Sequence, residues 1–256
     1  MTTRKMIYST WPELDRMNKK PILAVLPVGS IEQHGCHAPM GTDLIIAEAM
    51  AASITSDRVL LLPGIPVGVS EYHRGFFGSL WVSPEVLKEY VGSIIKSLMF
   101  HGINNVLIVN GHGGNREPLR EMARYLQMEN NYHVFVWTWF EAIEPQIIQM
   151  FGRRPPLHAD EAETAMLMAV NEKSIQKGMF EESRKGSSPV WGKFQNGTLI
   201  SQVVKDFSKS GATGDPTKTD MEQGKLMLKW SIENLKDFIN SLISKMDRDE
   251  EFKEVI

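Results

Sequence analysis

Short, almost continuously hydrophobic segments alternate along the chain with longer segments that carry apolar residues at helical spacing. Near-continuous apolar runs are typical of strands whose two faces are both covered, as in the parallel sheets of α/β proteins. Gly29 and Pro63 end the first two of these runs, which predicts turns at those points. The predicted strands span residues 22–28, 59–62, 106–109 and 134–139.

The segments between these runs carry the start and stop signals of helices. Residues 83–85 (Ser-Pro-Glu) combine a capping side chain, a proline at the first helical position and an acid in the first turn. The helix that they open is expected to run to about His101. Residues 219–222 form a capping box, which predicts a long amphipathic helix to about Lys245. Three further helices are expected at residues 42–54, 115–128 and 160–170.

This alternation predicts one α/β domain over residues 1–256, folded as a three-layer α/β/α sandwich around a mostly parallel central sheet. The sequence contains neither an internal repeat nor a linker that would divide it. Residues 185–216 are rich in Gly, Ser and Lys and are expected to form loops with one short hairpin.

The charge and composition of the chain exclude several classes of partner. The formal net charge of the 256 residues is −3 and Lys and Arg are not clustered, so neither nucleic acid nor a membrane surface is expected as a partner. The acidic stretch 247–254 is interpreted as a solvated helix end. A single cysteine, Cys36, fits a reducing compartment. With no apolar run of about 18 residues and no secretory leader, the chain is predicted to be cytoplasmic.

Polar clusters follow the predicted strands, where α/β proteins place their active sites. Glu32 and His34 come after the first strand, and in an extended segment side chains two residues apart point to the same side. Asp43 starts the next helix, where an aspartate is also a plain helix cap. His112 lies between glycines after the third strand, and glycine lets a backbone approach a ligand closely. Carboxylate and imidazole ligands together are typical of zinc, manganese or iron.

Two other segments leave alternatives open. Residues 158–164 (His-Ala-Asp-Glu-Ala-Glu-Thr) open a helix on which Glu161 and Glu163 point about 200° apart, so only one of them can face a site. Acids in a first helical turn are also favoured by the helix dipole alone. Residues 111–115 (Gly-His-Gly-Gly-Asn) join a strand to a helix as a phosphate-binding loop does, but they match neither the dinucleotide nor the P-loop pattern.

Together these motifs resemble the creatininase family. The family's Gly-Ser-x-Glu-Gln-His-Gly-Pro-His-x-Pro-x-Gly-Thr-Asp is matched over residues 29–43, with Cys36 where proline is usual. Residues 110–115 resemble its Asn-Gly-His-Gly-Gly-Asn segment, and residues 158–164 are similar to its His-Ala-Gly-x-x-Glu-Thr segment. Further similarities lie at residues 76–80 and 211–216.

The resemblance implies a centre of two divalent metal ions, with zinc expected first and manganese or iron as alternatives. One ion would be held by Glu32, Asp43 and His112, and the other by His34 and a bridging Asp43. Creatininase itself adds a glutamate to the second ion at the position that Gly114 occupies here. Glu163, from a neighbouring helix, is the expected replacement.

The same resemblance implies a metal-dependent hydrolase in which a metal-bound hydroxide cleaves a C–N bond of a cyclic amide or formamide. The expected catalytic residues are His158 and Glu163. His158 would protonate the leaving nitrogen, or else only orient a metal ligand. Hydrolysis of a C–C bond in a cyclic ketone and a non-catalytic, metal-stabilised binding protein stay open as alternatives.

The resemblance does not extend to the aromatic residues with which creatininase holds creatinine. Gly113 and residues 153–157 stand in their places, which predicts a site without that aromatic clamp. His73 and Arg74 follow the second strand and are expected to line the pocket, where an arginine would suit an anionic or polyhydroxylated substrate. The resemblance also implies that the substrate is a small molecule and that the chain forms a symmetric homo-oligomer, often a hexamer in this family.

Overall fold

The computed structural model describes residues 3–17, 20, 22–130, 132–152 and 158–248. Its central sheet has five parallel strands in the order β1-β3-β2-β4-β5. They are β1 (Arg4–Lys5), β2 (Leu23–Val28), β3 (Val59–Leu61), β4 (Asn105–Asn110) and β5 (His133–Thr138). Val28 pairs with Asn110, and Asn110 pairs with Thr138, so β2, β4 and β5 end level with one another.

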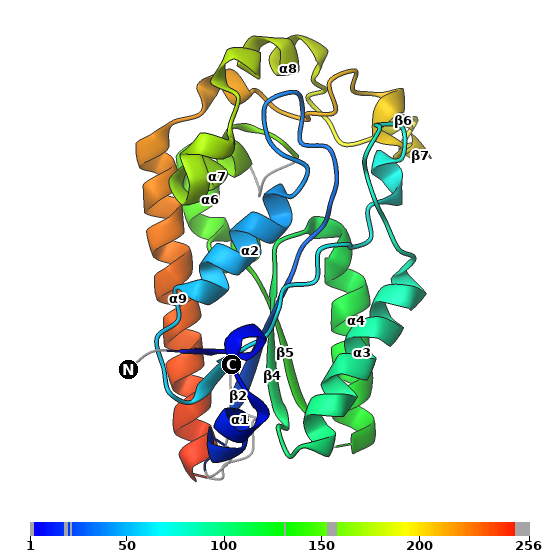
Figure 1. Cartoon of the computed structure of the whole chain (residues 1–256). Helices are drawn as coiled ribbons and strands as arrows, with labels where there is room; N and C mark the ends of the chain where they lie inside the picture. Colours follow the sequence, from blue (N-terminus) through cyan, green and yellow to red (C-terminus); the bar gives the residue numbers. More distant parts are fainter. Residues whose placement is uncertain (1–2, 18–19, 21, 131, 153–157, 249–256) are drawn as a thin grey trace.

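Helices cover both faces of this sheet (Figure 1). In the described part of the chain they are α1 (Trp11–Met17), α2 (Thr42–Ala52), α3 (Pro84–Phe100), α4 (Arg116–Asn130), α5 (Trp139–Ala142), α6 (Glu144–Phe151), α7 (Glu161–Asn171), α8 (Phe180–Gly186) and α9 (Met221–Arg248). The pair α3 and α4 packs on one face, whereas α2, α7 and α9 pack on the other. The predicted three-layer sandwich with a parallel sheet is therefore confirmed.

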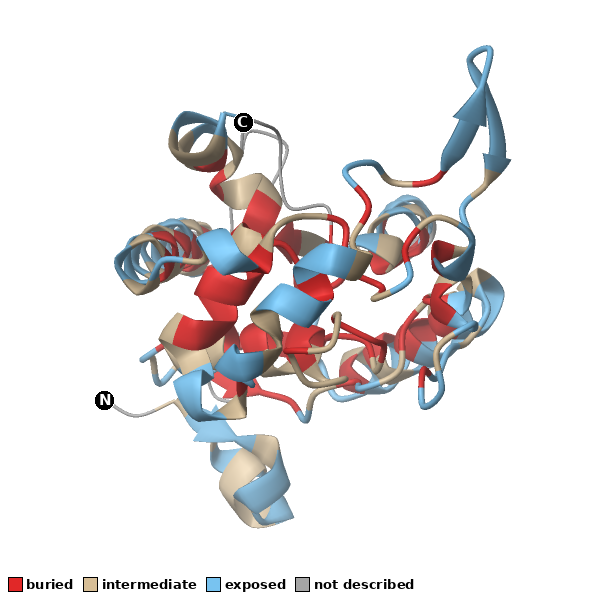
Figure 2. Cartoon of the chain, turned by 90° about the horizontal axis from the view of Figure 1, so that it is seen from above, coloured by how far each residue is buried: buried red, intermediate tan, exposed pale blue. Residues whose placement is uncertain are grey.

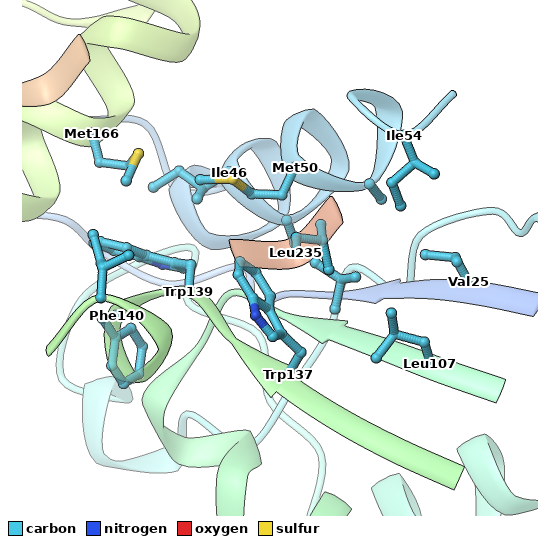
Figure 3. Packing of buried hydrophobic residues seen from close by; sticks show 14 of the residues in the cluster. Val25, Ile46, Met50, Ile54, Leu107, Trp137, Trp139, Phe140, Met166 and Leu235 are labelled. Carbon is cyan, nitrogen blue, oxygen red and sulfur yellow. The ribbon is translucent and has the colours of Figure 1, made fainter. Parts of the chain in front are cut away.

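Each central strand sends alternate side chains into two separate hydrophobic cores. Val25 and Leu107 belong to the core beneath α2, where Ile46 and Met50 cover them (Figure 3). Their neighbours along the two strands point the opposite way, into the core beneath α3 and α4. Because both faces are covered, polar residues have no place on these strands, which explains the continuous apolar runs in the sequence.

Local capping signals set the starts of the helices that border the site. Ser83 accepts a hydrogen bond from the backbone N–H of Val86 at 3.3 Å and so caps α3. Asp160 caps α7 by accepting from the backbone N–H groups of Ala162 and Glu163, at 3.0 and 2.9 Å. A cap satisfies amide groups that a helix itself leaves unpaired, and this holds the first turn of α7 in place.

Two glycines bring the loops after β2 and β4 against the first turn of α2. A Cβ on Gly29 would lie 2.5 Å from the backbone nitrogen of Leu44, and one on Gly111 would overlap the carbonyl oxygen of Asp43. Only glycine permits such an approach of one backbone to another. The carboxyl ends of parallel strands share one edge of a sheet, so these loops and the start of α2 meet at that edge.

The structure departs from the sequence prediction at some elements. The strand predicted to end at Trp139 ends one residue earlier, because Trp139 begins α5 and is fully buried. The expected hairpin is present as β6 (Lys193–Gln195) and β7 (Thr198–Ser201), and Figure 2 shows it projecting as an exposed arm. The expectations for residues 153–157 and 249–254 concern positions outside the described residues. Among the described residues, no helix combines the length and apolar character needed to span a lipid bilayer.

Candidate metal centre

Side chains from four segments meet in one buried cluster at the carboxyl edge of the sheet. Glu32 and His34 lie in the loop after β2, and Asp43 lies in the first turn of α2. His112 follows β4, and Glu163 lies in the first turn of α7. Each of the five residues is less than a tenth exposed. The structure therefore brings together all the residues that the sequence pointed to as metal ligands.

Carboxylate and imidazole groups alternate through this cluster. Oε2 of Glu32 lies 3.3 Å from Nε2 of His112, whose Nδ1 lies 3.1 Å from Oδ2 of Asp43. Oδ1 of Asp43 lies 3.4 Å from Nε2 of His34, which in turn lies 3.6 Å from Oε2 of Glu163. Asp43 therefore stands between the two histidines and presents one oxygen to each.

Several ligand-type atoms of the cluster have no hydrogen-bond partner among the described residues. They are both carboxylate oxygens of Glu32, Oδ2 of Asp43, and Nε2 of His34 and of His73. Unpaired buried carboxylate oxygens are costly unless a cation compensates for them. Three groups of potential ligand atoms in the described residues each lie within 4.8 Å of one another: Glu32, Asp43 and His112; His34, His158 and Glu163; and Glu32, His73 and His158. The donor set and its spacing fit divalent metal ions.

Without a bound cation, the carboxylates raise the pKa values of two histidines. Burial lowers the pKa of His112, but the carboxylates of Glu32 and Asp43 outweigh burial and raise it to about 9. Burial also opposes protonation of His34, yet Asp43 and Glu163 raise its pKa well above the ordinary 6.5. Burial opposes ionisation of Asp43, but the two histidines hold its pKa well below its usual range. At neutral pH, His34 and His112 are therefore protonated, and their rings supply positive charge beside the carboxylates.

The side-chain amide of Gln33 determines which nitrogen of His73 carries the proton. Its Oε1 accepts from the backbone N–H of Gly35 at 2.9 Å, and its Nε2 donates to the carbonyl of Gly211 at 3.2 Å, which settles how the amide is oriented. The same Nε2 donates to Nδ1 of His73 at 2.7 Å, so the proton of neutral His73 sits on Nε2, 3.2 Å from Oε1 of Glu32. His73 thus turns the N–H at Nε2 towards Glu32 without completing a hydrogen bond, and a protonated nitrogen cannot bind a metal ion.

His158 presents its other nitrogen to the same carboxylate. Its Nε2 donates to the backbone carbonyl of Gln33 at 2.6 Å, and its Nδ1 lies 3.6 Å from Oε1 of Glu32. The 2.9 Å separation between Nε2 of His158 and Nε2 of Gln33 joins two hydrogen-bearing atoms and is not a hydrogen bond. Burial, reinforced by the neighbouring His73 and His34, holds the pKa of His158 well below 6.5. The ring is therefore neutral at pH 7, with a free lone pair on Nδ1.

The structure also decides two alternatives that the sequence left open. The N-cap residue of α2 is Gly41, so Asp43 is not the cap of this helix and its carboxylate is free to face the cluster. On α7 it is Glu163 that faces the cluster, whereas Glu161 accepts a hydrogen bond from the backbone N–H of Asp215 at 3.2 Å. The spacing argument that only one of the two glutamates can reach a site is confirmed.

Two polar side chains near these motifs lie outside the cluster. His37 contacts the hydroxyls of Ser183 and Thr164, each at 2.9 Å, and so links the β2 loop to α8 and α7. Burial lowers the pKa of His37 to about 4, so it is a neutral structural residue at pH 7. Arg74, which the sequence places at the pocket, has an exposed guanidinium that pairs with Glu71 at 2.9 Å.

An aromatic surface that the sequence pattern did not reveal borders the cluster. Tyr72 lies in the loop after β3, and Trp191 precedes the hairpin. The ring centroid of Trp191 lies 5.4 Å from that of Tyr72, 5.8 Å from His73 and 6.0 Å from His158. The predicted absence of the creatininase clamp concerns Gly113 and residues 153–157, and the latter lie outside the described residues; the rings of Tyr72 and Trp191 come from other elements. No local pattern links two positions so distant in the sequence.

Comparison with known proteins identifies the family. The family model described as "Creatininase: Creatinine amidohydrolase" matches residues 8–239. The chain belongs to the creatininase family. Similar proteins include the mycofactocin precursor peptide peptidase of Mycobacterium tuberculosis, which is 27% identical over 216 residues that cover 78% of each protein. The 3-dehydro-scyllo-inosose hydrolase of Thermotoga maritima is 25% identical over 261 residues, covering 91% of this chain and 80% of the relative.

Solved creatininases share this fold. A crystal structure of creatinine amidohydrolase (creatininase) superposes with a TM-score of 0.76 and 21% identity, over 95% of this chain and 99% of the other. Creatininases of the same fold have been solved in a manganese form and, for a variant, in a Zn-Zn form. The predicted family and its hydrolase class are therefore confirmed, and relatives named as amidohydrolase and peptidase support a metal-dependent C–N hydrolase.

Proposed function

We propose that this chain uses two divalent metal ions to hydrolyse a C–N bond of a small cyclic amide or formamide. One observation carries the proposal: five buried side chains from four segments of the chain meet in one cluster. Several of their ligand atoms have no hydrogen-bond partner among the described residues. Hydrophobic packing alone gives no reason to bury carboxylates in this way, whereas a metal centre does.

The geometry supports a division of these side chains between two ions. Glu32, Asp43 and His112 would hold one ion, with Nδ1 of His112 facing Asp43. His34, Asp43 and Glu163 would hold the other, and Glu163 supplies the carboxylate that the loop after β4 lacks. Mixed oxygen and nitrogen ligands favour zinc, with manganese or iron as alternatives.

In the proposed mechanism His158 is the residue that moves the proton. Bound divalent ions would polarise the amide carbonyl and make a water molecule more acidic. Neutral His158, with Nδ1 free beside Glu32, is placed to accept the proton of the attacking water and to return it to the leaving nitrogen as the C–N bond breaks. Glu163 is assigned to metal binding, because its Oε2 faces His34 and also accepts the backbone N–H of Ala159 at 2.7 Å.

Metal analysis and a substrate panel test this proposal together. We expect about two ions per purified chain and chelator-sensitive hydrolysis of at least one member of a panel of cyclic amides, formamides and short peptides. Glu32→Gln should abolish hydrolysis, whereas Glu89→Gln, an exposed carboxylate on α3, should leave it unchanged. Full activity of the Glu32→Gln variant would contradict the proposed centre.

The same panel separates the alternatives. The Thermotoga relative is named for an inosose substrate, so the panel includes a cyclic ketone derived from a carbohydrate. If the chain opens the ring of the ketone but hydrolyses no amide, the proposed reaction becomes cleavage of a C–C bond instead of a C–N bond. Loss of thermal stability on metal removal, with no turnover of any member, would favour a metal-stabilised binding protein.

We also propose that the chain forms a homo-oligomer, a hexamer by resemblance to the family. Large apolar side chains exposed on the single chain support an interface between copies; Tyr8, Trp11 and Phe100 are 82%, 79% and 87% exposed. Light scattering on the purified protein should give the mass of six chains. A mass equal to one chain would contradict the proposal.

A further inference from the structure

Tyr72 holds a phenolic hydroxyl at the edge of the metal-binding cluster. It lies in a short 3-10 helix (Glu71–His73) after β3, and its Oη is 3.0 Å from Nε2 of His112. Its ring stacks near that of His112, at 6.2 Å between centroids and 25° between planes. The edge contact with Trp191, at 5.4 Å, confines the ring from another side. The direction of the hydroxyl is therefore fixed by packing.

The hydrogen of this hydroxyl points away from His112. Nε2 of His112 lies 3.0 Å from the carbonyl oxygen of Val69, and a carbonyl can only accept, so Nε2 carries the proton. Facing that N–H, the oxygen of Tyr72 can only accept as well. Its own hydrogen is thus free for another acceptor, and His112 is the only hydrogen-bond partner of this hydroxyl found within the described residues.

The hydroxyl of Tyr72 lies so close to the loop after β4 that position 114 has no room for a side chain. A Cβ on Gly114 would overlap both Oη of Tyr72 and the carbonyl oxygen of Val69, and would come within 2.7 Å of Nε2 of His112. The glycine therefore keeps the loop after β4 clear for the hydroxyl. In contrast, a Cβ on the neighbouring Gly113 would meet no atom within 4 Å.

We propose that the hydroxyl of Tyr72 is a catalytic residue that donates a hydrogen bond to the carbonyl oxygen of the substrate; this inference rests on the proposed function. The hydroxyl and Oε2 of Glu32 are both neighbours of Nε2 of His112, so a carbonyl seated beside Glu32 is within reach of Tyr72. A donor fixed before the reaction stabilises the negative charge that develops on this oxygen when water attacks. The hydroxyl keeps its proton throughout, since His158 carries the proton from water to the leaving nitrogen.

Tyr72→Phe tests the inference because it removes the hydroxyl and keeps the ring. The probe is acetohydroxamate, which presents a carbonyl oxygen to a metal ion, binding to the zinc-loaded protein. We expect its affinity to fall by about tenfold or more, the effect of losing one hydrogen bond to a charged oxygen. We expect the zinc affinity to stay within about twofold, because no ligand atom is removed. For any amide that the wild type hydrolyses, kcat should fall by about 10²-fold with a smaller change in KM.

Tyr90→Phe on α3 is the matched control, since Tyr90 is exposed and should leave every measured value unchanged. An unchanged hydroxamate affinity in Tyr72→Phe overturns the inference. A parallel loss of zinc affinity also overturns it, because the hydroxyl would then only position His112. A wild type that loads zinc but binds no hydroxamate contradicts this inference alone, while a wild type that loads no zinc contradicts the proposed function as well.

Discussion

The chemistry of the centre depends on which nitrogen of each histidine carries a proton. Backbone carbonyls accept from Nε2 of His112 and of His158, so both rings turn Nδ1 towards the carboxylates. Gln33 donates to Nδ1 of His73, which therefore turns an N–H towards Glu32. The motifs predicted that these residues gather, but not these assignments, because the acceptors become neighbours only when the chain folds.

Zinc binding should release protons at neutral pH. The pKa of His112 is raised to about 9 and that of His34 lies well above 6.5, so both rings are protonated in the absence of metal. Loading both sites should release about two protons per chain at pH 7, and zinc should bind more tightly as the pH rises towards 9. Calorimetry in two buffers of different ionisation enthalpy measures the release.

The control for proton release is His101→Gln, a change at an exposed residue, which should give the same proton count as the wild type. Zinc affinity that is independent of pH between 6 and about 9 would show that the two rings are neutral before the metal arrives.

Removal of the His158 ring should separate proton transfer from metal binding. His158→Gln is expected to lower kcat by about 10²–10⁴-fold, the usual contribution of a general acid–base group. Its zinc content should stay unchanged, because the proposed ligands do not include this residue. Zinc analysis alongside steady-state kinetics measures both; a zinc content that falls with kcat would make His158 a ligand instead.

At the scale of elements, close backbone contacts bring the ligands of separate loops together. The sequence located β2, β4 and α7 to within a residue or two, because apolar runs and the Asp160 cap are local signals. It did not predict α1, α5, α6 or α8, and it could not predict the strand order or the position of Tyr72 and Trp191 beside the centre. These depend on packing between segments far apart in the chain, for which one sequence carries no local pattern.

Gly111→Ala should disturb the centre through the backbone. The added methyl would overlap the carbonyl oxygen of Asp43 and push the first turn of α2 away from the loop after β4. We expect a loss of about 1–3 kcal/mol in the free energy of unfolding, as for other overpacked positions, together with weaker zinc binding. Denaturant unfolding and zinc titration measure the two effects.

The matched variant is Gly113→Ala, two residues further along, where a Cβ meets nothing within 4 Å. It should change the free energy of unfolding by less than about 0.5 kcal/mol. Equal effects of the two substitutions would mean that the close approach to α2 does not position Asp43.

At the scale of the whole molecule, the centre connects loops that leave the sheet between two hydrophobic cores. The family and the layered fold predicted from the sequence are confirmed, because the motif over residues 29–43 is long and specific. The prediction of a single domain over residues 1–256 and the prediction of a hexamer stay predictions. The first concerns whether the whole chain unfolds as one unit, and the second concerns contacts between copies of the chain. Neither is determined by the residues of the site motifs.

Removal of metal should lower the melting temperature of the whole protein. A ligand present at about a thousand times its dissociation constant stabilises the folded state by about 4 kcal/mol, so a chelator should lower Tm by about 10 °C. Scanning calorimetry measures the shift, and a single transition would support one domain. Asp43→Asn, which weakens both proposed sites, should melt at nearly the same temperature with and without chelator. A wild type that does not respond would contradict a resident metal centre.

The proposed metal ligands and the proposed proton-transfer residue all lie at one rim of the parallel sheet, and this has a consequence for protein engineering. Tyr72 and Trp191 border that rim, and neither side chain belongs to either hydrophobic core. Randomised libraries restricted to residues 189–191, which are exposed or only partly buried, should therefore yield folded proteins at high frequency. Such libraries offer a route to altered selectivity in which the scaffold and its ion-holding residues are left untouched.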